Sequence, residues 1–331
     1  MSRRDMVIRT LAALSATVVD ALLPETAAAQ RPERMYRLGF LTTSSSPATA
    51  HAALTRSLAD LGYHEGRNLV VERRYAAGEL GRLPLLAADL VHANVDVIVT
   101  EATPAALAAK QATVRIPIVM ATGGDAVGSG LVATLARPGG NITGLTSLAS
   151  QLDAKKVELL RELKPDARRI AYLGNSQIVA EQIGFREVKT AAKAIGMDAI
   201  FVNAPVPEAF EAAFTTMTEA GVDVVLVPPS APNTDGRSRI VGTAARHRMP
   251  AVYGAREFAD AGGLVAYGTS RAALFGRAAV FVDKILKGAD PSDLPVEQAK
   301  TFELVINLRT ARELGLTVPR SLLARADEVI E

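Results

Sequence analysis

Three short sequence patterns occur twice in this chain, in the same order. Each pattern is an apolar run, and the pairs are Arg37–Thr42 with Arg169–Gly174, Val95–Val99 with Val222–Val227, and Arg115–Val119 with Arg248–Val252. The separations within the pairs are 132, 127 and 133 residues, so the two halves keep nearly one register. A single match between apolar runs arises easily by chance, whereas three matches in the same order indicate an internal repeat of one structural unit.

The apolar runs alternate with stretches that have helical spacing. Residues 68–75 and 116–121 have the apolar, β-branched composition of strands. Residues 80–93 place leucines on one side of a helix, and Pro104 occupies the tolerated first turn of another helix that continues to Gln111. Short apolar strands separated by amphipathic helices are typical of a parallel sheet covered on both faces. The sequence therefore predicts an α/β fold with two lobes of like topology.

A glycine-rich segment lies between the two halves. Gly139 and Gly140 follow Pro138 and favour a turn that no helix would tolerate. Residues 141–146 can then run extended from one lobe to the other, as a hinge at which a few changes of backbone dihedral angles rotate whole lobes. An ordinary interdomain linker is the alternative interpretation. We expect Asp153 to cap the helix that follows.

The composition excludes one class of partner. At 331 residues the chain is long enough for two α/β domains of ordinary size. Its formal net charge is +2, and the Lys and Arg residues are spread among Asp and Glu. A nucleic-acid-binding protein would show clustered basic residues, so we expect no nucleic acid partner.

The first 29 residues have the features of an export signal. Arg3 and Arg4 form a basic start, residues 11–19 are mostly apolar, and residues 27–29 are the small alanines that signal peptidase requires. The paired arginines also resemble a twin-arginine signal, so both export routes stay open. A short N-terminal helix on a cytoplasmic protein is the alternative. The apolar run is too short to span a bilayer, which takes about 20 residues, and we expect no membrane span in the mature chain.

The absence of cysteine bears on where the protein works. A lipoprotein anchor needs a Cys at the cleavage site, and the sequence contains none. An exported protein with a large core does not need disulfides. We therefore expect a soluble, untethered protein in the periplasm, with residues 1–29 removed as a signal peptide.

The candidate site lies beyond the carboxyl ends of the predicted strands, because ligands of open parallel α/β sheets bind there. The candidate ligand-binding residues on these loops are Thr42, Thr43, Ser44, Ser45, Thr100, Glu101, Thr103, Thr122, Asp125, Asn175, Ser176, Ser230, Tyr253 and Glu257. Short hydroxyl side chains at helix starts leave backbone N–H groups available for a carboxylate or phosphate. Helix capping alone is the alternative for each loop, and the expected convergence on one cleft favours binding.

Two acidic and two aromatic residues stand out near this edge. Asp125 and Glu257, one from each half, could accept hydrogen bonds from a ligand amine or help to bind a cation, or they could form salt bridges with neighbouring arginines. Tyr253 and Tyr267 could stack on a flat ligand, and core packing explains them equally well.

Enzyme motifs are missing from the sequence. It contains no G-x-S-x-G elbow, no H-E-x-x-H motif and no G-x-x-x-x-G-K-[S/T] phosphate loop, and it has no Cys nucleophile. The loop after the first strand lacks the G-x-G-x-x-G fingerprint of dinucleotide binding. The four histidines lack metal-ligand spacing. We therefore expect no catalysis, no metal and no cofactor.

Long stretches of the chain resemble the tryptophan/phenylalanine-type substrate-binding proteins of ABC transporters. The resemblance covers residues 36–331. Its most specific stretches are residues 125–145, which contain Gly-Leu-Val-Ala-Thr-Leu-Ala-Arg-Pro-Gly-Gly-Asn-Ile-Thr-Gly, the Leu-Pro-Val-Glu-Gln of residues 294–298, and the tail at residues 302–316 and 324–331. Familiar Gram-positive members of the family are lipoproteins, and this chain departs from them by lacking the lipid-bearing Cys.

The resemblance implies two Rossmann-like lobes joined by three crossover segments, a type 1 periplasmic-binding-protein-like fold. Lobe I would comprise residues 36–145 with about 269–290, and lobe II residues 146–268 with about 291–331. A small solute, such as an amino acid or an organic acid, would bind between the lobes, be enclosed by hinge motion and pass to a membrane permease. The family's pocket positions correspond to residues 42–46, 100–103, Asp125, 175–177, Ser230 and Glu257. A solute-sensing module that reports to a membrane signalling partner is the alternative function.

Overall fold

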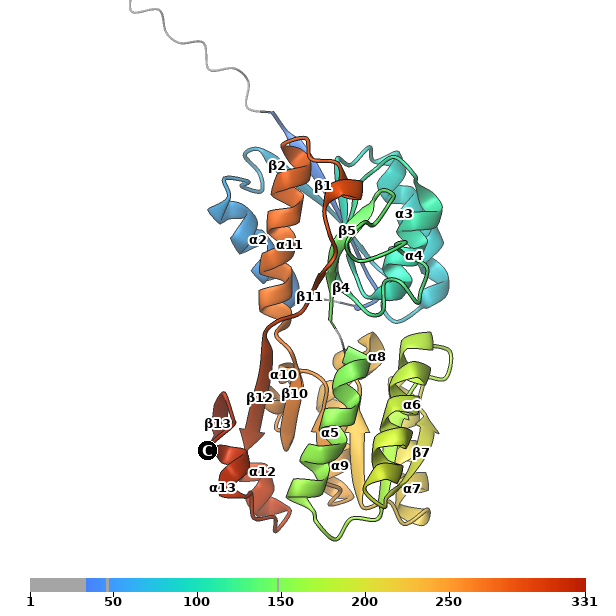
Figure 1. Ribbon diagram of the computed structural model, residues 1–331, viewed down its shortest axis with the longest axis vertical. Coiled ribbons are helices and arrows are strands. Elements are labelled where there is room, and N and C mark those ends of the chain that lie inside the picture. Colours follow the sequence, from blue (N-terminus) through green and yellow to red (C-terminus); the bar gives the residue numbers. More distant parts are fainter. Residues whose placement is uncertain (1–33, 46–47, 148) are drawn as a thin grey trace, which may run out of the picture. The chain divides into compact units, whose positions relative to one another are not determined.

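The computed structural model describes residues 34–45, 48–147 and 149–331. The predicted signal peptide, residues 1–29, and the end of the first candidate loop, residues 46–47, lie outside the described residues. From Tyr36 onward the strands form two separate sheets, each covered by helices (Figure 1). We use lobe I for the part built on the six-stranded sheet and lobe II for the part built on the seven-stranded sheet.

Lobe I has the strand order β11-β5-β4-β3-β1-β2, and every neighbouring pair is parallel. Its strands are β1 (Tyr36–Thr42), β2 (Leu69–Tyr75), β3 (Val97–Glu101), β4 (Ile118–Gly123), β5 (Ile142–Thr146) and β11 (Glu297–Gln298). Its helices are α2 (Ala48–Asp60), η1 (Leu80–Arg82), α3 (Leu83–His92), α4 (Thr103–Ala112), α11 (Arg271–Leu286) and η3 (Pro291–Asp293). All five residues of β3 are buried, as expected for a strand covered on both faces.

Lobe II has the strand order β13-β12-β10-β9-β8-β6-β7. Its strands are β6 (Arg169–Gly174), β7 (Asp198–Asn203), β8 (Val224–Val227), β9 (Ala251–Tyr253), β10 (Val265–Thr269), β12 (Phe302–Asn307) and β13 (Glu328–Ile330). Its helices are α5 (Ala149–Leu163), α6 (Val179–Ala194), η2 (Pro207–Ala209), α7 (Phe210–Glu219), α8 (Ala231–Asp235), α9 (Arg237–Arg246), α10 (Arg256–Asp260), α12 (Leu308–Glu313) and α13 (Arg320–Leu323).

The predicted duplication is confirmed at the level of topology. The first five strands of each half are ordered second, first, third, fourth, fifth: β2-β1-β3-β4-β5 in lobe I and β7-β6-β8-β9-β10 in lobe II. The three repeated sequence patterns correspond to β1 and β6, β3 and β8, and β4 and β9. The fold class predicted from the sequence, two Rossmann-like α/β lobes, is therefore correct.

The chain passes between the lobes three times, between β5 and α5, between β10 and α11, and between β11 and β12. Two of these passages exchange helices. Helix α5 follows the last parallel strand of lobe I but packs against β8, β9 and β10, whereas α11 follows β10 but packs against α2 and β4. Figure 1 shows α11 beside α2 in lobe I, and α5 beside α6 in lobe II.

One strand of lobe II departs from the expectation of parallel sheets. β12 runs antiparallel to β10, with Thr269 opposite Phe302 and Val265 opposite Ile306. The reason is the direction of entry, because β10 leaves lobe II at the edge that faces lobe I and β12 returns through the same edge. β11 also differs from the expected division, since residues 291–331 were assigned to lobe II and Glu297–Gln298 pair with β5 in lobe I.

Apolar side chains fill both faces of each sheet. In lobe I one core lies beneath α2 and α11, where the rings of Phe40 and Phe275 are 6.1 Å apart, and a second lies beneath α3 and α4. In lobe II one core includes Tyr172 beneath α5 and α6, and another includes Phe210 and Phe214 of α7. These cores hold the carboxyl ends of the strands in fixed positions, which is the prerequisite for a binding site.

Gly144 allows β5 to approach β4, and its replacement is our first test of the fold. Its φ is +122°, and a Cβ there would lie 2.6 Å from the Met120 backbone nitrogen and still closer to the Met120 carbonyl oxygen. We predict that Gly144→Ala lowers the free energy of unfolding by about 2 kcal/mol or more, since it adds backbone strain to a steric clash. Urea denaturation measures this change.

Gly140→Ala is the matched control, because Gly140 is exposed and a Cβ there would meet no atom within 4 Å. Its free energy of unfolding should stay within about 0.5 kcal/mol of that of the unsubstituted protein. Equal stabilities of the two variants would contradict the close approach of β5 and β4.

Candidate functional site

A cavity of about 140 Å³ lies where the carboxyl ends of the strands of both lobes meet. Lobe I and the passages between the lobes contribute Thr43, Ser44, Leu80, Glu101, Ala102, Thr103, Pro104, Thr122, Gly124, Ser147 and Arg271. Lobe II contributes Asp153, Tyr172, Ile178, Ala180, Glu181, Pro228, Pro229, Ser230, Ala231, Pro232, Gly254 and Thr269. The loops after β1 and β3, and those after β6 and β8, flank the points at which the strand order reverses, the usual ligand position of such sheets.

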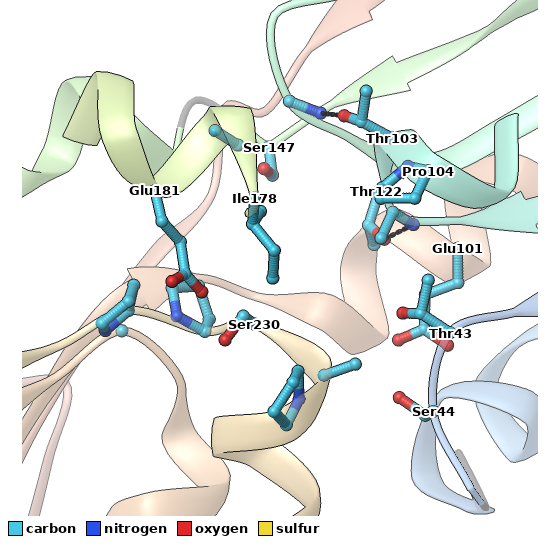
Figure 2. A pocket seen from close by; sticks show the side chains of 18 of the residues that line it. Thr43, Ser44, Glu101, Thr103, Pro104, Thr122, Ser147, Ile178, Glu181 and Ser230 are labelled. Carbon is cyan, nitrogen blue, oxygen red and sulfur yellow. Dashed lines mark hydrogen bonds between the residues drawn. The ribbon is translucent and has the colours of Figure 1, made fainter. Parts of the chain in front are cut away.

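The lobe I wall is polar and ordered by internal hydrogen bonds. Glu101 ends β3 with only 2% of its surface exposed, and its Oε2 accepts a hydrogen bond of 2.7 Å from Thr42 Oγ1. Thr42 Oγ1 also accepts the Ser44 N–H at 3.0 Å, which shapes the turn that presents Thr43 and Ser44. Figure 2 shows Thr43, Ser44 and Glu101 grouped on one side of the cavity.

The start of α4 forms the next part of this wall. Pro104 occupies its first turn, Thr103 Oγ1 accepts the Gly124 N–H at 3.0 Å, and Thr122 Oγ1 accepts the Ala102 N–H at 3.2 Å. Ala102 has φ +69° and ψ 154°, a conformation that only glycine adopts without strain. Backbone strain of this kind concentrates at functional sites, and here it lies directly before the amino end of a ten-residue helix.

Arg271 connects the two lobes at the edge of the cavity. It stands at the first position of α11 and forms an ion pair with Glu101 of lobe I. Its Nε also lies 3.1 Å from Glu257 Oε1 in lobe II. Both carboxylates raise the pKa of Arg271 against the opposing effect of burial, so the guanidinium stays charged. A second connection between the lobes is the hydrogen bond of 2.8 Å from the Ser45 N–H to Asp235 Oδ2.

Glu181 is the principal acidic group of the lobe II wall. It is the third residue of α6, it is 3% exposed, and its Oε2 accepts the backbone N–H of Asn175. Burial raises the pKa of Glu181 to about 7; nearby Asp153 adds to the shift, and the Ser230 hydroxyl and the Asn175 N–H oppose it. Gly174 provides the space, because a Cβ there would lie 2.6 Å from Glu181 Oε2.

Behind Glu181 lies a buried ion pair. Lys156 Nζ lies 2.6 Å from Asp153 Oδ1, and both side chains are at most 2% exposed. Tyr172 Oη donates to Asp153 Oδ2 at 3.3 Å. Burial raises the pKa of Asp153, with Lys156 acting in the opposite direction. The predicted helix cap at Asp153 is wrong, because α5 begins at Ala149 and Asp153 lies inside the helix.

The rest of the cavity surface is apolar and rigid. It includes four prolines, Pro104, Pro228, Pro229 and Pro232, together with Ile178 at the start of α6. Figure 2 shows Ile178 between the Glu181 side and the Glu101 side of the cavity. A solute held there would therefore meet polar groups at two walls and an apolar surface between them.

The structure brings six of the fourteen predicted residues to the cavity surface. These are Thr43, Ser44, Glu101, Thr103, Thr122 and Ser230. Thr42 and Glu257 do not line the cavity but contact residues that do. Thr42 donates a hydrogen bond to Glu101, and Glu257 forms an ion pair with Arg271.

The remaining six predicted residues do not line the cavity. Ser45 is engaged with Asp235, and Thr100 is buried in β3. Asp125 is exposed and accepts the N–H groups of Val127 and Gly128 in its own turn, and it forms no salt bridge with the residues that the structure describes. Asn175 and Ser176 are held in the β6–α6 loop, the first by Gln177 and the second by Asn203. Tyr253 is buried in the core and stacks on Phe258, with ring centroids 4.9 Å apart, as its alternative interpretation stated.

Sequence reasoning missed the groups that carry most of the charge at the cavity, Asp153, Glu181 and Arg271. Two of them lie within helices and the third directly follows a strand-to-helix passage, so the search of strand-end loops did not reach them. The sequence repeat could have pointed to Arg271. β10 is the counterpart of β5, so Arg271 at the start of α11 occupies the position that the start of α5 occupies in the first half.

The arrangement is suited to holding a small polar solute by hydrogen bonds. Hydroxyls and the amino end of α4 offer donors to an anionic group, and buried carboxylates offer acceptors on the opposite wall. Among the described residues there is no group of three or more His, Cys, Asp or Glu side chains placed to hold a metal ion. Nor does any helix in the described part of the chain have the length and apolar character that crossing a membrane requires.

Two α/β lobes of like topology that enclose a polar cavity between their strand ends define a two-lobed solute-binding fold. The family model for ABC transporter substrate binding proteins matches residues 44–330, and the chain belongs to this family. It is similar to the tyrosine-binding protein of Clostridioides difficile, with 26% identity over 267 residues, which cover 81% of this chain and 76% of the relative.

Solved structures resemble the whole of the described fold. A domain from Streptococcus pneumoniae in complex with L-Trp is 28% identical and superposes with a TM-score of 0.83, covering 89% of this chain and 100% of that one. A conserved domain protein from Vibrio cholerae is 29% identical with a TM-score of 0.84 and the same coverage. A solute-binding protein of Rhodopseudomonas palustris in complex with 3,4-dihydroxybenzoic acid, 16% identical with a TM-score of 0.55 over 78% of this chain and 83% of that one, shares the fold.

The raised pKa of Glu181 gives the unliganded protein a defined pH dependence. The folded protein binds more protons than the unfolded chain between the ordinary value of 4.5 and about 7, so the free energy of unfolding falls as the pH rises through this window. Above it the loss amounts to about 3 kcal/mol. We predict that Glu181→Gln removes this loss and makes the protein more stable than the unsubstituted form at pH 8, with little difference at pH 4.5.

Urea denaturation at pH 4.5, 6 and 8 measures this effect. Glu219→Gln, at the exposed end of α7, is the control and should keep the original slope. An unchanged slope in Glu181→Gln would show that Glu181 ionises at its ordinary pKa.

Proposed function

We propose that this protein captures a small solute in the cavity between its lobes, outside the cytoplasm, and delivers it to the permease of an ABC transporter. The observation that carries the proposal is that polar groups of both lobes line one cavity, with Glu101 and Thr43 on one side and Glu181 and Ser230 on the other. Only a solute that contacts both walls gains binding free energy when the two lobes come together. Membership in a transporter substrate-binding family favours transport over sensing, and binding over catalysis.

The cavity chemistry supports a solute that carries a carboxylate, such as an amino acid or an organic acid. Hydroxyls and helix starts suit the carboxylate, and the proline-rich surface suits an apolar or flat body. Tyrosine, for which the similar Clostridioides difficile protein is named, and L-Trp, which is bound in the similar Streptococcus pneumoniae structure, have both features. We infer that aromatic amino acids and their analogues are the first solutes to test.

The capture cycle is a shift of population between open and closed arrangements of the lobes. A ligand favours the closed form because only that form offers it both walls. Moving the balance from mostly open to mostly closed takes about 5.5 kcal/mol of differential binding. Two to four hydrogen bonds to charged groups, at about 1.5–3 kcal/mol each, supply this amount. The three passages between the lobes are the segments at which rotation would occur.

Export and delivery complete the proposal. The signal-peptide features of residues 1–29 and the family's role support release into the periplasm as a soluble protein. The closed form would then dock on a permease, and an opening of the lobes would release the solute without chemical change.

A solute screen tests the proposal. We predict that at least one aromatic amino acid or aromatic acid raises the melting temperature of the purified mature chain, because a ligand stabilises by RT ln(1 + [L]/Kd), or about 4 kcal/mol at 1,000 times Kd. Calorimetry then measures Kd, and small-angle scattering should show a smaller radius of gyration with solute. The protein contains no Trp, so the fluorescence of bound L-Trp can be followed directly. A panel of amino acids, organic acids and aromatic acids that leaves the melting temperature unchanged would overturn the proposal.

The ion pair between Arg271 and Glu257 offers a test of lobe closure that does not alter the cavity surface. Glu257 lies in lobe II and does not line the cavity, yet it holds Arg271, which is paired with Glu101 in lobe I. We predict that Glu257→Gln lowers solute affinity by up to about fivefold, since a partly exposed ion pair contributes up to about 1 kcal/mol to the closed form. Small-angle scattering without solute should show a larger radius of gyration.

Glu328→Gln is the matched control. It removes another Arg–Glu pair of lobe II, that of Arg256 and Glu328, which does not connect the lobes. Its solute affinity should be unchanged. A Glu257→Gln variant that behaves like this control would show that the pair contributes nothing to closure.

A further inference from the structure

One oxygen of the Glu181 carboxylate is left without a partner. Oε2 accepts the Asn175 N–H, a local bond of the kind that an acidic residue at the third helix position makes with the preceding loop. Oε1 is buried and accepts no hydrogen bond of ordinary geometry within the described part of the chain, although the Ser230 hydroxyl lies near enough to the carboxylate to lower its pKa. Helix capping therefore explains one oxygen and not the other. A buried carboxylate oxygen without a donor is costly, so it indicates a donor that is supplied from elsewhere.

The surroundings of Glu181 are arranged to hold the carboxylate at the cavity. Gly174, at the end of β6, leaves room for Oε2, and Ser230 faces the carboxylate from the start of α8. Figure 2 shows the Glu181 side chain extending from α6 toward Ser230, on the wall opposite Glu101.

No charged side chain among the described residues forms an ion pair with Glu181. Lys156 on α5 is bound to Asp153, and Arg271 across the cavity is bound to Glu101 and Glu257. Asp153 on α5 is a second negative charge near Glu181, and Tyr172 on β6 donates to Asp153. Among the described ion pairs none includes Glu181, so the lobe II wall has a local excess of negative charge.

We propose that Glu181 is a specificity-determining residue, which accepts a hydrogen bond from an ammonium group of the solute and makes the binding of that solute depend on pH. This inference rests on the proposed function, since it requires that the cavity holds a solute. It selects, among carboxylate-bearing solutes, those that also carry a cationic nitrogen. A solute that carries only a carboxylate would face the negative wall without an attractive partner.

The pH dependence follows from the ionisation of Glu181. Its pKa of about 7 means that the ionised fraction of the unliganded protein falls about tenfold between pH 8 and pH 6. An ammonium-bearing solute prefers the ionised form and should bind more weakly at pH 6. A solute with a carboxylate and no ammonium prefers the protonated form and should bind more tightly at pH 6. The two solutes should therefore show opposite pH slopes.

Two probe pairs test the inference, L-tryptophan with indole-3-propionate and L-tyrosine with 3-(4-hydroxyphenyl)propionate. The members of each pair differ by the amino group. Calorimetry at pH 6, 7 and 8 should show that the amino acid loses about tenfold in affinity from pH 8 to pH 6 in the unsubstituted protein. In Glu181→Gln the amino acid should bind at least tenfold more weakly at pH 8, with little pH dependence, while its deaminated partner should bind no worse.

Stability separates a loss of recognition from a loss of fold. Glu181→Gln should be at least as stable as the unsubstituted protein at pH 8, so weaker binding there cannot be ascribed to unfolding. Glu219→Gln is the control and should keep the affinities and pH slopes of the unsubstituted protein.

The outcomes distinguish the two proposals. Equal affinity for both members of a pair, with no effect of Glu181→Gln, would overturn the role of Glu181 and leave the solute-binding function intact. Binding of an amino acid with unchanged pH dependence in Glu181→Gln would overturn the proton linkage and assign it to another group. Binding of neither member of either pair, by the unsubstituted protein, would reject both the aromatic solute class and the inference built on it.

Discussion

The fold depends on the reciprocal exchange of two helices between the lobes. The last parallel strand of each repeat, β5 or β10, is followed by a helix that packs on the other lobe, so each lobe's apolar core is completed by a segment that the other lobe supplies. Since an uncovered sheet face would expose the apolar residues of its core, neither lobe is complete by itself. The exchange also turns the carboxyl ends of both parallel sets toward each other. The capture cycle proposed above would rotate the lobes about their three connections while their strand ends keep facing one cavity.

At this cavity the acidic group of the lobe I wall is paired with a cation, whereas one acidic group of the lobe II wall is not. In lobe I, Glu101 is satisfied by Thr42 and Arg271, and the pairing continues to Glu257 across the gap. In lobe II, Lys156 is bound to Asp153, and Glu181 has no cationic partner in the part of the chain that the structure describes. Burial of an unpaired carboxylate is unfavourable, and the raised pKa of Glu181 expresses that cost. A binding protein can use such a cost, because the solute that relieves it gains affinity that other solutes do not.

The sequence located the general position of the site better than its chemistry. Strand ends can be recognised from apolar runs, which is why Thr43, Ser44 and Glu101 were predicted correctly to lie together. Asp125 does not line the cavity, because an acidic residue before a glycine-rich turn satisfies backbone N–H groups locally as readily as it faces a ligand. Glu181 was not recognised, since a glutamate three residues into a helix is ordinarily solvent-exposed.

Local patterns alone determined that this chain forms two α/β lobes with one topology, because apolar periodicity and the repeat of three strand sequences specify which segments become strands and in what order they recur. Only the tertiary structure decided which lobe each late segment joins. Strand β11 belongs to lobe I and β12 runs antiparallel in lobe II because the chain crosses between the lobes, and a crossing leaves no periodic signature. The ionisation of Glu181 was likewise decided in three dimensions, since burial and neighbouring charges set a pKa and neither can be read from sequence spacing.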